Sequence, residues 1–574
     1  MRSFKILNYP SRWNIFRIDD RLLLIFIGFI VGSCSGLAAV ALSRSLTAIL
    51  NWLHPYRHIW WAFLLPAAGA ALSSLFMNKI VKEGAGHGVP EVIYSVSRYG
   101  GLLRLRSSYS RLISSCLTIG SGGSAGPEAP IVMSGAAIGS NIAKFFSLND
   151  RQRVTLVGCG AAGAISSIFN APIAGMVFTI EVILGEWTAL NIVPIAIASV
   201  AGTEISRFLQ GNNIAFKPQQ FNIGAMDIIA CVGLALVTAA ASVLLTRALR
   251  GMHKISARVP VSLWLRAAIG GGIVGGIGIF MPVVLGEGYH FIQEMIDGTF
   301  SQGLIIAAIA TLAKIFATSF TLGWGGSGGI FAPGLVIGSL AGITYHRFLV
   351  WLWPSAAWVN EGCFALLGMA GLIGGMLQAP LTGIFLIVEI TGGYQAILPL
   401  IIVSAMSSTM CHYIEPASFY FKELVDKGQL LRPRTDARIL SDLKVQELLE
   451  RDCISVHQNM LLRDFIDIVK ISHRNFFPVE DEDTGEFIGM IHLDDIRAYL
   501  FNPVMYDAVI LEQIMNTRQQ TVHLDDDLSV ILRTMDEKRL FSMPVVSSNR
   551  FIGMISKATL LDQYRKELRV QTFQ

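Results

Sequence analysis

The chain has 574 residues, of which 52% are hydrophobic and 15% are charged. An ordinary soluble domain carries about 25% charged residues, so this composition excludes a wholly soluble protein, and the length exceeds that of one domain. The net charge of +4, without a basic run suited to phosphates, excludes nucleic acid as a partner. Seven scattered cysteines without a CxxC pair indicate neither a disulfide framework nor a metal site.

The first apolar run, residues 22–42, follows five basic residues. By the positive-inside rule these place the N-terminus in the cytoplasm. Further apolar stretches recur up to residue 413, and several are too short or too rich in glycine to cross a bilayer as one straight helix. Such breaks are tolerated at membrane depth only inside protein or along a cavity. We therefore predict that residues 1–420 form a mostly α-helical, multi-pass domain with broken helices, in the plasma (inner) membrane if the source is bacterial.

Two sequence blocks recur in the same order in the two halves of this region. Residues 122–133 (GGSAGPEAPIVM) match residues 325–336 (GGSGGIFAPGLV) at an offset of 203. Residues 169–182 match residues 377–390 at an offset of 208. Paired, glycine-interrupted segments in two halves of a membrane protein point to a transporter's binding site. We therefore expect the ligand to lie between the halves.

Three glycine-rich loops each precede an apolar run: residues 86–90 (GHGVP), 126–130 (GPEAP) and 329–333 (GIFAP). Helix starts leave free backbone N–H groups and a partial positive charge, so several aimed at one point form an anion site. The alternative is that these loops are only tight turns between packed helices. Glu128 lies in the second loop, and an intramembrane carboxylate is a functional hypothesis by default. It would compete with an anion when ionised and leave when protonated.

These loops resemble those of the CLC chloride channels and chloride/proton antiporters. Residues 86–90 look like the GSGIP loop of that family, residues 126–130 like its G(K/R)EGP loop, and residues 329–333 like its GIFAP loop. The resemblance covers about residues 20–420. It implies the CLC fold, in which two halves of broken helices are inverted relative to each other, and a homodimer with a separate anion pathway in each subunit.

The resemblance also implies roles for individual residues. Glu128 would be the gating glutamate. The candidate anion-binding residues are His87, Gly88, Val89, Ile330, Phe331 and Tyr420. Among them, Ile330 and Phe331 would bind the central anion through backbone N–H groups, together with the Tyr420 hydroxyl. His87 stands where many members have serine, and its ring either donates an N–H or carries a charge, or turns away and leaves only backbone contacts.

Val182 occupies the position where antiporters of the family commonly have a second, proton-accepting glutamate. Valine cannot relay a proton, which favours passive or weakly coupled chloride conduction. Chloride/proton exchange stays the alternative, because some antiporters of the family lack this acid. The neighbouring Glu181 has a counterpart in the other half, Glu389, and we expect both to act structurally at helix ends.

Residues 421–574 carry more than half of the charged side chains, as expected of a soluble module. Basic residues within 421–440 indicate a cytoplasmic linker. Residues 476–491 and 542–555 resemble each other, and each predicts a strand at Pro-Val, a turn and a strand ending in Gly-Met-Ile, flanked by helices. This small α/β tail resembles a pair of CBS domains. The expected boundaries are 441–503 for the first and 508–570 for the second.

CBS pairs can bind adenine nucleotides through a glycine, two apolar residues, Ser or Thr, and an Asp three residues further on. The first copy here has His492 and Asp495 and lacks the hydroxyl, whereas the second has Ser556 and Thr559 and lacks the acid. Two readings of the pair therefore stay open, a nucleotide sensor and a purely structural, dimer-stabilising module.

We therefore expect chloride transport gated by Glu128, channel-like or weakly coupled to protons. The expected partners are chloride and similar anions, protons, the lipid bilayer and a second copy of the chain, with no required cofactor. The sequence has no HExxH or GxSxG motif, so we do not expect an enzyme. A CBS-regulated cation transporter is a distant alternative, since a cation site would need several acids at membrane depth.

Overall fold

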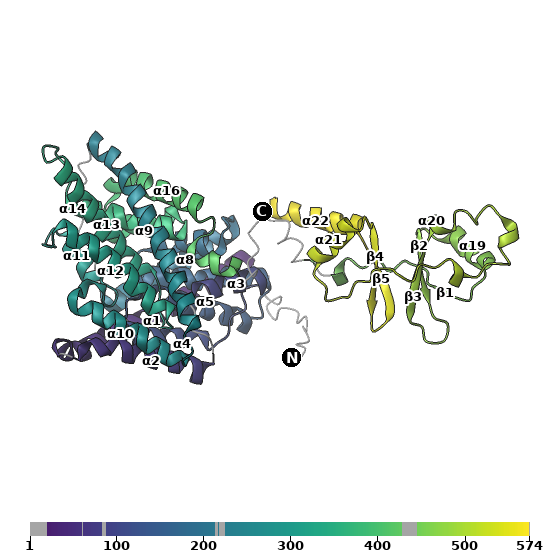
Figure 1. Cartoon of the computed structure of the whole chain (residues 1–574), viewed down its shortest axis with the longest axis horizontal. Coiled ribbons are helices and arrows are strands. Elements are labelled where there is room, and N and C mark those ends of the chain that lie inside the picture. The colour runs from purple at the N-terminus through teal and green to yellow at the C-terminus, as the bar shows by residue number, and fades with distance from the viewer. Residues whose placement is uncertain are drawn as a thin grey trace. The chain divides into compact units, whose positions relative to one another are not determined.

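The computed structural model describes residues 20–59, 61–82, 88–212, 216, 224–426, 443 and 445–572. The chain divides into two compact units, Met1–Leu430 and Leu431–Gln574 (Figure 1). Most of the predicted linker, residues 421–440, lies outside the described residues, since residues 427–440 are not described. The four-part division expected from the sequence stays a prediction.

The first unit is helical. Eight stretches among the described residues are long and apolar enough to cross a membrane. The first half contains α1 (Asp20–Leu53), α2 (Leu65–Leu75), α3 (Val89–Arg98), α4 (Ser107–Gly120), α5 (Glu128–Phe145), α6 (Asp150–Phe169), α7 (Pro172–Phe178) and α8 (Ala189–Gln210). The second contains α9 (Ala225–Arg258), α10 (Leu263–Phe280), α11 (Tyr289–Ile296), α12 (Leu304–Gly323), α13 (Phe331–Leu352), α14 (Glu361–Leu377), α15 (Pro380–Thr391), α16 (Ile397–Ile414) and α17 (Phe419–Asp426).

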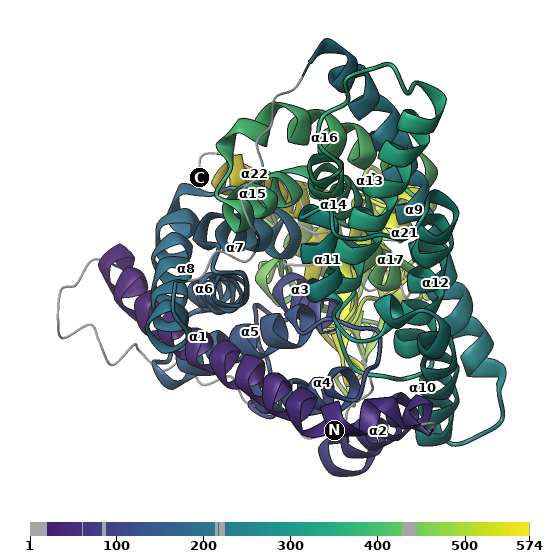
Figure 2. The same cartoon turned by 90° about the vertical axis from the view of Figure 1, so that its left-hand side faces the viewer.

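The two halves of this unit pack in the same pattern. Helix α1 lies against α6 and α8, and α9 lies in the same way against α14 and α16. Helix α5 packs on α6 as α13 packs on α14. Figure 2 shows α1 running along the outside of the first half. The repeat seen in the sequence is therefore also a repeat of packing, and the two loops that it relates are those at the starts of α5 and α13.

Glycines bring the innermost helices of each half into backbone contact. A Cβ added to Gly160 in α6 would lie 1.9 Å from the carbonyl oxygen of Gly135 in α5. In the second half, a Cβ on Gly368 in α14 would lie 2.2 Å from the carbonyl oxygen of Gly338 in α13. Small residues permit such close helix approach in membranes, where van der Waals contact replaces the hydrophobic drive between helices. These contacts fix where α5 and α13 begin.

Two repeat-related glutamates join the halves through helix starts. Glu389 accepts hydrogen bonds from the backbone N–H groups of Ile173 and Ala174, at 2.9 and 2.6 Å, in the first turn of α7. Glu181 accepts from Leu381 and Thr382, at 3.2 and 2.8 Å, in the first turn of α15. A carboxylate at a helix N-terminus satisfies orphan N–H groups and meets the positive end of the helix dipole. The predicted structural role of both acids at helix ends is confirmed.

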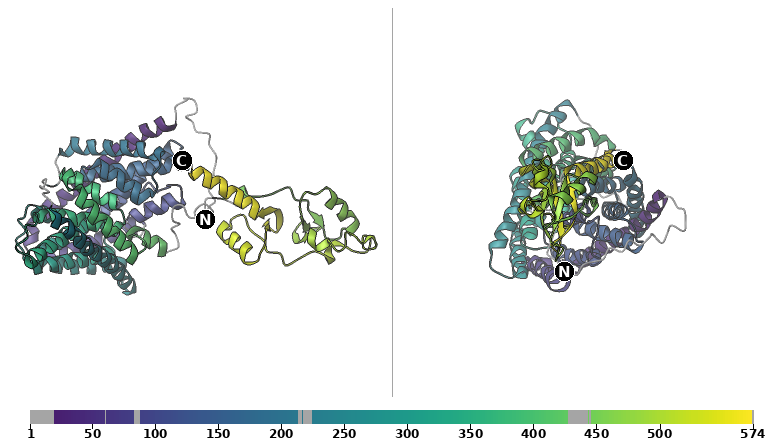
Figure 3. Two further views of the ribbon diagram at one scale, coloured as in Figure 1. Left: turned by 90° about the horizontal axis from the view of Figure 1, so that it is seen from above. Right: turned by 90° about the vertical axis from the view of Figure 1, so that its right-hand side faces the viewer.

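The second unit holds two similar α/β halves. In the first, β1 (Val456–His457) pairs in parallel with β2 (Phe476–Glu480), which pairs antiparallel with β3 (Phe487–His492). In the second, β4 (Ser542–Ser547) pairs antiparallel with β5 (Arg550–Ser556). The helices are α19 (Leu462–Ile471), α20 (Leu493–Ile496), α21 (Leu528–Glu537) and α22 (Lys557–Thr572), the last a single long helix in Figure 3. The strands predicted at both Pro-Val and Gly-Met-Ile segments are confirmed.

Candidate functional site

The two glycine-rich loops related by the repeat pair directly with each other. The N–H of Gly126 donates to the carbonyl of Gly329 at 2.8 Å, and the N–H of Gly329 donates to the carbonyl of Gly126 at 2.7 Å, as one isolated antiparallel bridge. A Cβ on Gly329 would lie 3.0 Å from Ala129, so a larger residue there would be crowded. The bridge holds the first turns of α5 and α13 side by side.

Hydroxyl groups from two further helices support these loops in a reciprocal way. The N–H of Ser124 donates to the Thr321 hydroxyl of α12 at 3.0 Å. The N–H of Ser327 donates to the Thr118 hydroxyl of α4 at 3.2 Å. Each half therefore supports the loop of the other half. The predicted meeting of the two halves at this point is what the structure shows.

Glu128, the first residue of α5, lies against the start of α13. Its side chain is buried, with 1% of its surface exposed. Its Oε2 accepts from the backbone N–H of Ala332 at 3.4 Å, and its Oε1 accepts from the Tyr289 hydroxyl at 2.5 Å. A Cβ on Gly126 would lie 2.1 Å from Oε2, so the carboxylate folds back over that glycine. The carboxylate thus occupies the positive end of α13, where the sequence predicts an anion.

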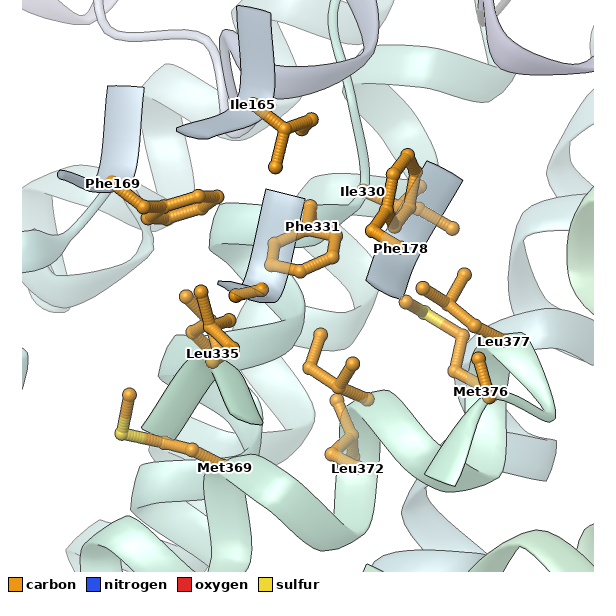
Figure 4. Close-up of a cluster of buried hydrophobic side chains, with 14 of the residues drawn as sticks. Ile165, Phe169, Phe178, Ile330, Phe331, Leu335, Met369, Leu372, Met376 and Leu377 are labelled. Atoms are coloured by element: carbon orange, nitrogen blue, oxygen red, sulfur yellow. The ribbon is translucent and has the colours of Figure 1, made fainter. Parts of the chain in front are cut away.

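The residues at the start of α13 are packed so that their backbone faces the site. Ile330 and Phe331 are 1% and 2% exposed. The Phe331 ring packs against the rings of Phe169 and Phe178, with centroids 5.4 and 6.1 Å away, within the apolar cluster of Figure 4. These contacts fix the first turn of α13, whose N–H groups have no partner inside the helix. The two residues can therefore offer backbone donors while their side chains serve packing.

The third loop and the tyrosine complete the set of predicted residues. Gly88 precedes α3 with φ of +87°, a conformation that favours glycine, and a Cβ there would lie 2.9 Å from the Ala129 carbonyl. Val89 begins α3 and is fully buried. Tyr420 in α17 is 1% exposed and lies close enough to Glu128 for its hydroxyl to feel the carboxylate charge. His87 lies outside the described residues.

Three residues near Glu128 were missed by sequence reasoning. Tyr289 belongs to no motif and comes from a segment 161 residues away. Lys314 in α12 is fully buried, and its Nζ donates to the carbonyls of Val284 and Gly286, both at 3.0 Å. Glu287 lies on the same loop, within electrostatic range of both Glu128 and Lys314. A lone lysine in an apolar run was the available signal, because an intramembrane cation marks a functional site by default.

Val182 lies in the π-helical turn Thr179–Leu184 that follows α7, and it is 1% exposed. The turn packs against α3, the helix that begins at the third loop. The side chain that follows Glu181 is therefore buried and apolar. The structure therefore supplies no ionisable group at this position.

The two candidate nucleotide positions of the tail differ in the structure. Ser556 donates to Glu450 at 2.5 Å, Thr559 also donates to Glu450, and Arg474 pairs with the other oxygen of Glu450 at 2.6 Å. Arg474 further binds Asp452 and holds the pKa of that carboxyl below its ordinary value. The second-copy residues are therefore engaged with a carboxylate of their own chain.

Of the first-copy residues, His492 borders an open space instead. The backbone N–H of His492 donates to Asp495 at 3.2 Å. His492 also lines a cavity of about 400 Å³, which Arg497 and Arg539 border as well. Residues of both copies line this cavity, and it brings together two guanidinium groups that suit an anionic ligand, Arg497 of the first copy and Arg539 of the second.

The family profile described as voltage gated chloride channel matches residues 69–412, more than half of the chain. The chain belongs to the voltage-gated chloride channel (CLC) family. Its tail matches the CBS domain profile twice, at residues 445–502 and 511–566. The resemblance predicted from the loops, and the CBS pair predicted from the tail, are confirmed.

Relatives of this CLC protein span its membrane unit. A ClcB-like chloride channel protein of Ralstonia nicotianae is 30% identical over 416 residues, which cover 70% of this chain and 96% of that protein. The H⁺/Cl⁻ exchange transporter ClcA of Vibrio cholerae is 28% identical over 401 residues, covering 66% and 84%.

Solved structures show the same fold. A slow cyanobacterial Cl⁻/H⁺ antiporter matches with a TM-score of 0.65 and 23% identity, over 73% of this chain and all of that chain. A eukaryotic CLC transporter matches with a TM-score of 0.63 and 15% identity, over 94% and 98%. The predicted fold class, a helical membrane protein of the CLC fold with a small α/β CBS pair, is confirmed, and with it a multi-pass membrane protein.

Proposed function

We propose that this CLC protein moves chloride across the membrane in exchange for protons, with Glu128 as the group that gates the pathway and carries the proton. The observation behind this proposal is the position of the Glu128 carboxylate against the start of α13. The sequence favoured a channel-like pathway because of Val182. Its alternative, exchange, has the better support, since relatives such as ClcA of Vibrio cholerae are H⁺/Cl⁻ exchange transporters.

Competition between two anions explains how one residue can couple the two ions. An ionised Glu128 and a chloride ion both favour the N-terminus of α13, because that helix end is partially positive and has free N–H donors. Protonation removes the charge of the carboxylate, so the neutral side chain yields its place to chloride. Loss of the proton restores the competition and drives chloride out. A proton bound and released at Glu128 thus accompanies each exchange of occupants.

We assign the remaining anion contacts to the residues gathered around this point. The backbone N–H groups of Ile330 and Phe331 and the Tyr420 hydroxyl bind the central chloride. Gly88 and Val89 add the start of α3. Backbone dipoles hold a dehydrated anion without the full charge of lysine or arginine, so the ion can also leave.

The proposed exchange has to work without a carboxylate at position 182. Val182 is buried and cannot titrate, so protons reach Glu128 from the cytoplasmic side by another route, such as water in the anion pathway. We therefore expect weaker coupling of protons to chloride than in a member with an acid at that position.

We also propose the assembly and orientation that the family resemblance implies. Each subunit of a homodimer carries its own pathway. Both termini lie in the cytoplasm, because basic residues precede the first membrane helix and follow the last.

Purified protein in chloride-loaded liposomes tests the proposed function. Chloride efflux and external pH are followed together, with and without valinomycin. We expect uphill proton uptake driven by the chloride gradient. Chloride efflux without proton movement would make the protein a channel, and no chloride movement would overturn the transport assignment.

The Glu128→Gln variant tests the gate in the same liposomes. Glutamine cannot titrate, so we expect chloride flux that no longer depends on pH and no longer moves protons. Glu294→Gln in α11 is the matched control, since this acid pairs with the exposed His290 at 3.2 Å and has no contact with Glu128 among the described residues. A Glu128→Gln variant with unchanged proton coupling would exclude Glu128 as the coupling group.

A further inference from the structure

The hydroxyl of Tyr289 contacts the gating carboxylate from a separate element. Tyr289 is the first residue of α11, and its hydroxyl donates to Oε1 of Glu128 at 2.5 Å. The other carboxylate oxygen accepts from Ala332 at 3.4 Å, a longer bond. Tyr289 therefore provides the shorter of the two hydrogen bonds that keep Glu128 at the start of α13.

The buried side chain of Lys314 holds the loop that leads to Tyr289. Lys314 of α12 donates to the carbonyls of Val284 and Gly286, which precede Tyr289 by three to five residues. A Cβ at Gly288 would lie 3.5 Å from the Lys314 Nζ. Phe216 packs against the Tyr289 ring, with centroids 6.4 Å apart. Lys314 holds the loop that precedes Tyr289, and Phe216 packs on its ring, so the hydroxyl is presented to Glu128 by a fixed element.

Charged and titratable groups face Glu128 from each neighbouring element. Among the described residues they are Tyr289 of α11, Glu287 of the loop before it, and Tyr420 of α17, while Lys314 of α12 lies within electrostatic range of Glu287. Among these described groups, Tyr289 is the one that hydrogen-bonds the carboxylate. Glu287 is an acid and Lys314 a base, and the two side chains lie within electrostatic range of each other.

We propose that Tyr289 is a positioning residue that latches ionised Glu128 onto the start of α13 and lets it go when it is protonated. A hydroxyl donated to a carboxylate forms a charge-assisted bond, about twice as strong as a bond between neutral groups. The latch is therefore strong while Glu128 is charged and weak once the proton arrives. Tyr289 thereby sharpens the dependence of opening on protonation. This inference rests on the proposed function of Glu128 as the gate.

The test is the pH profile of chloride flux from liposomes for Tyr289→Phe. The ring and its contact with Phe216 stay, and only the hydroxyl is lost. The closed, ionised state loses its latch, so less acid is needed to open the pathway. We expect the midpoint of acid activation to move to higher pH by about one unit, the equivalent of one charge-assisted hydrogen bond. Flux at alkaline pH should rise by a similar factor, about tenfold.

Two comparisons separate the latch from a general effect of the substitution. Tyr345→Phe removes a hydroxyl from α13, in a ring that packs on Phe364 rather than at the gate, and should leave the profile unchanged. In a Glu128→Gln background, adding Tyr289→Phe should change nothing, because the charge that the latch holds is gone. A Tyr289→Phe profile equal to wild type, or a full effect in the Glu128→Gln background, overturns the latch. Loss of chloride flux from the wild type would overturn the proposed function instead.

Discussion

Glu128 and Lys314 are both buried, and their hydrogen-bond partners are backbone groups and one hydroxyl. Glu128 accepts from Ala332 and Tyr289, and Lys314 donates to two loop carbonyls. A buried charge left without such partners costs several kcal/mol. Removing one partner therefore destabilises the charged form of the side chain. Loss of the Tyr289 hydroxyl alone is thus an informative change.

Val182 permits a direct test of proton coupling at the level of one residue. Val182→Glu places an ionisable group in the buried turn after α7. We expect more protons moved per chloride than in the wild type, because the new carboxyl can pass protons toward Glu128. The measurement is the reversal potential, or simultaneous proton and chloride flux, in liposomes.

The matched control for this experiment is Val182→Gln. Glutamine has nearly the same shape as glutamate but cannot titrate, so it reports the cost of placing a long polar side chain in an apolar position. Equal coupling in the two variants would show that an acid at this position does not relay protons in this protein.

Sequence reasoning located Glu128 because its loop carries a recognisable pattern of glycine and proline before an apolar run. It could not locate Tyr289, since no local pattern says which tyrosine reaches a carboxylate 161 residues away. Lys314 carried a usable signal, a single lysine within the apolar stretch that forms α12, but nothing in its neighbourhood identified its partners as two carbonyls of a loop.

Because Glu181 and Glu389 each cap a helix of the other half, removing either acid should destabilise the protein to a similar extent. Glu389→Ala leaves the N–H groups of Ile173 and Ala174 without their acceptor, and Glu181→Ala does the same at the start of α15. Loss of a helix cap costs about 1–2 kcal/mol. We expect each variant to lower the melting temperature of the detergent-solubilised protein, and by similar amounts.

Glu204→Ala in α8 is the control for this comparison, because Glu204 is exposed and pairs only with Arg207 within its own helix. Its melting temperature should match the wild type. A normal melting temperature for Glu389→Ala would mean that water replaces the carboxylate at the start of α7.

Close helix packing predicts a stronger effect at single glycines. Gly160→Ala would place a methyl group 1.9 Å from the Gly135 carbonyl oxygen, so α5 and α6 would have to move apart. We expect loss of folded protein in fluorescence-detected size-exclusion chromatography. Gly276→Ala in α10 is the matched control, since a Cβ there meets nothing within 4 Å. Equal yields for the two variants would contradict the importance of this contact.

The repeat explains why so much of the element arrangement was accessible from sequence. The offsets of 203 and 208 align the starts of α5 and α13 and of α7 and α15, and these are the helices whose first turns meet the partner half. For Glu181 and Glu389, the sequence predicted only that both acids lie at helix ends, not that each caps a helix of the other half. Which helix each acid caps depends on the packing of the two halves, and spacing along the chain carries no information on that.

Whether the CBS pair binds a nucleotide can be tested on the full-length protein. The cavity at His492 has Arg497 and Arg539 on its border, whereas Ser556 and Thr559 are held by Glu450. We expect an adenine nucleotide to bind in this cavity, which residues of both copies line. Isothermal titration of ATP into purified protein should show about one site per chain.

Single substitutions show which of the two candidate positions in the CBS pair binds the nucleotide. Arg539→Ala should abolish the titration signal, because it removes a cation that faces the phosphates. Arg533→Ala, an exposed residue paired with Glu537, should leave it intact. Binding that survives Arg539→Ala but disappears in Ser556→Ala would move the site from the cavity to the position of Ser556 and Thr559. No binding by the wild type would favour the purely structural pair.

The bridge between Gly126 and Gly329 also bears on how such a chain arose. Two identical half-length chains facing each other across a two-fold axis would pair the same glycine with itself, donor to acceptor in both directions, as these loops do. Duplication and fusion of a gene would keep this contact and free the next positions to diverge. By the offset of 203, Glu128 corresponds to Phe331: one copy has kept or gained a titratable gate, and the other an aromatic side chain anchored in the core. At this contact, the two halves therefore differ in function at one pair of corresponding positions, Glu128 and Phe331.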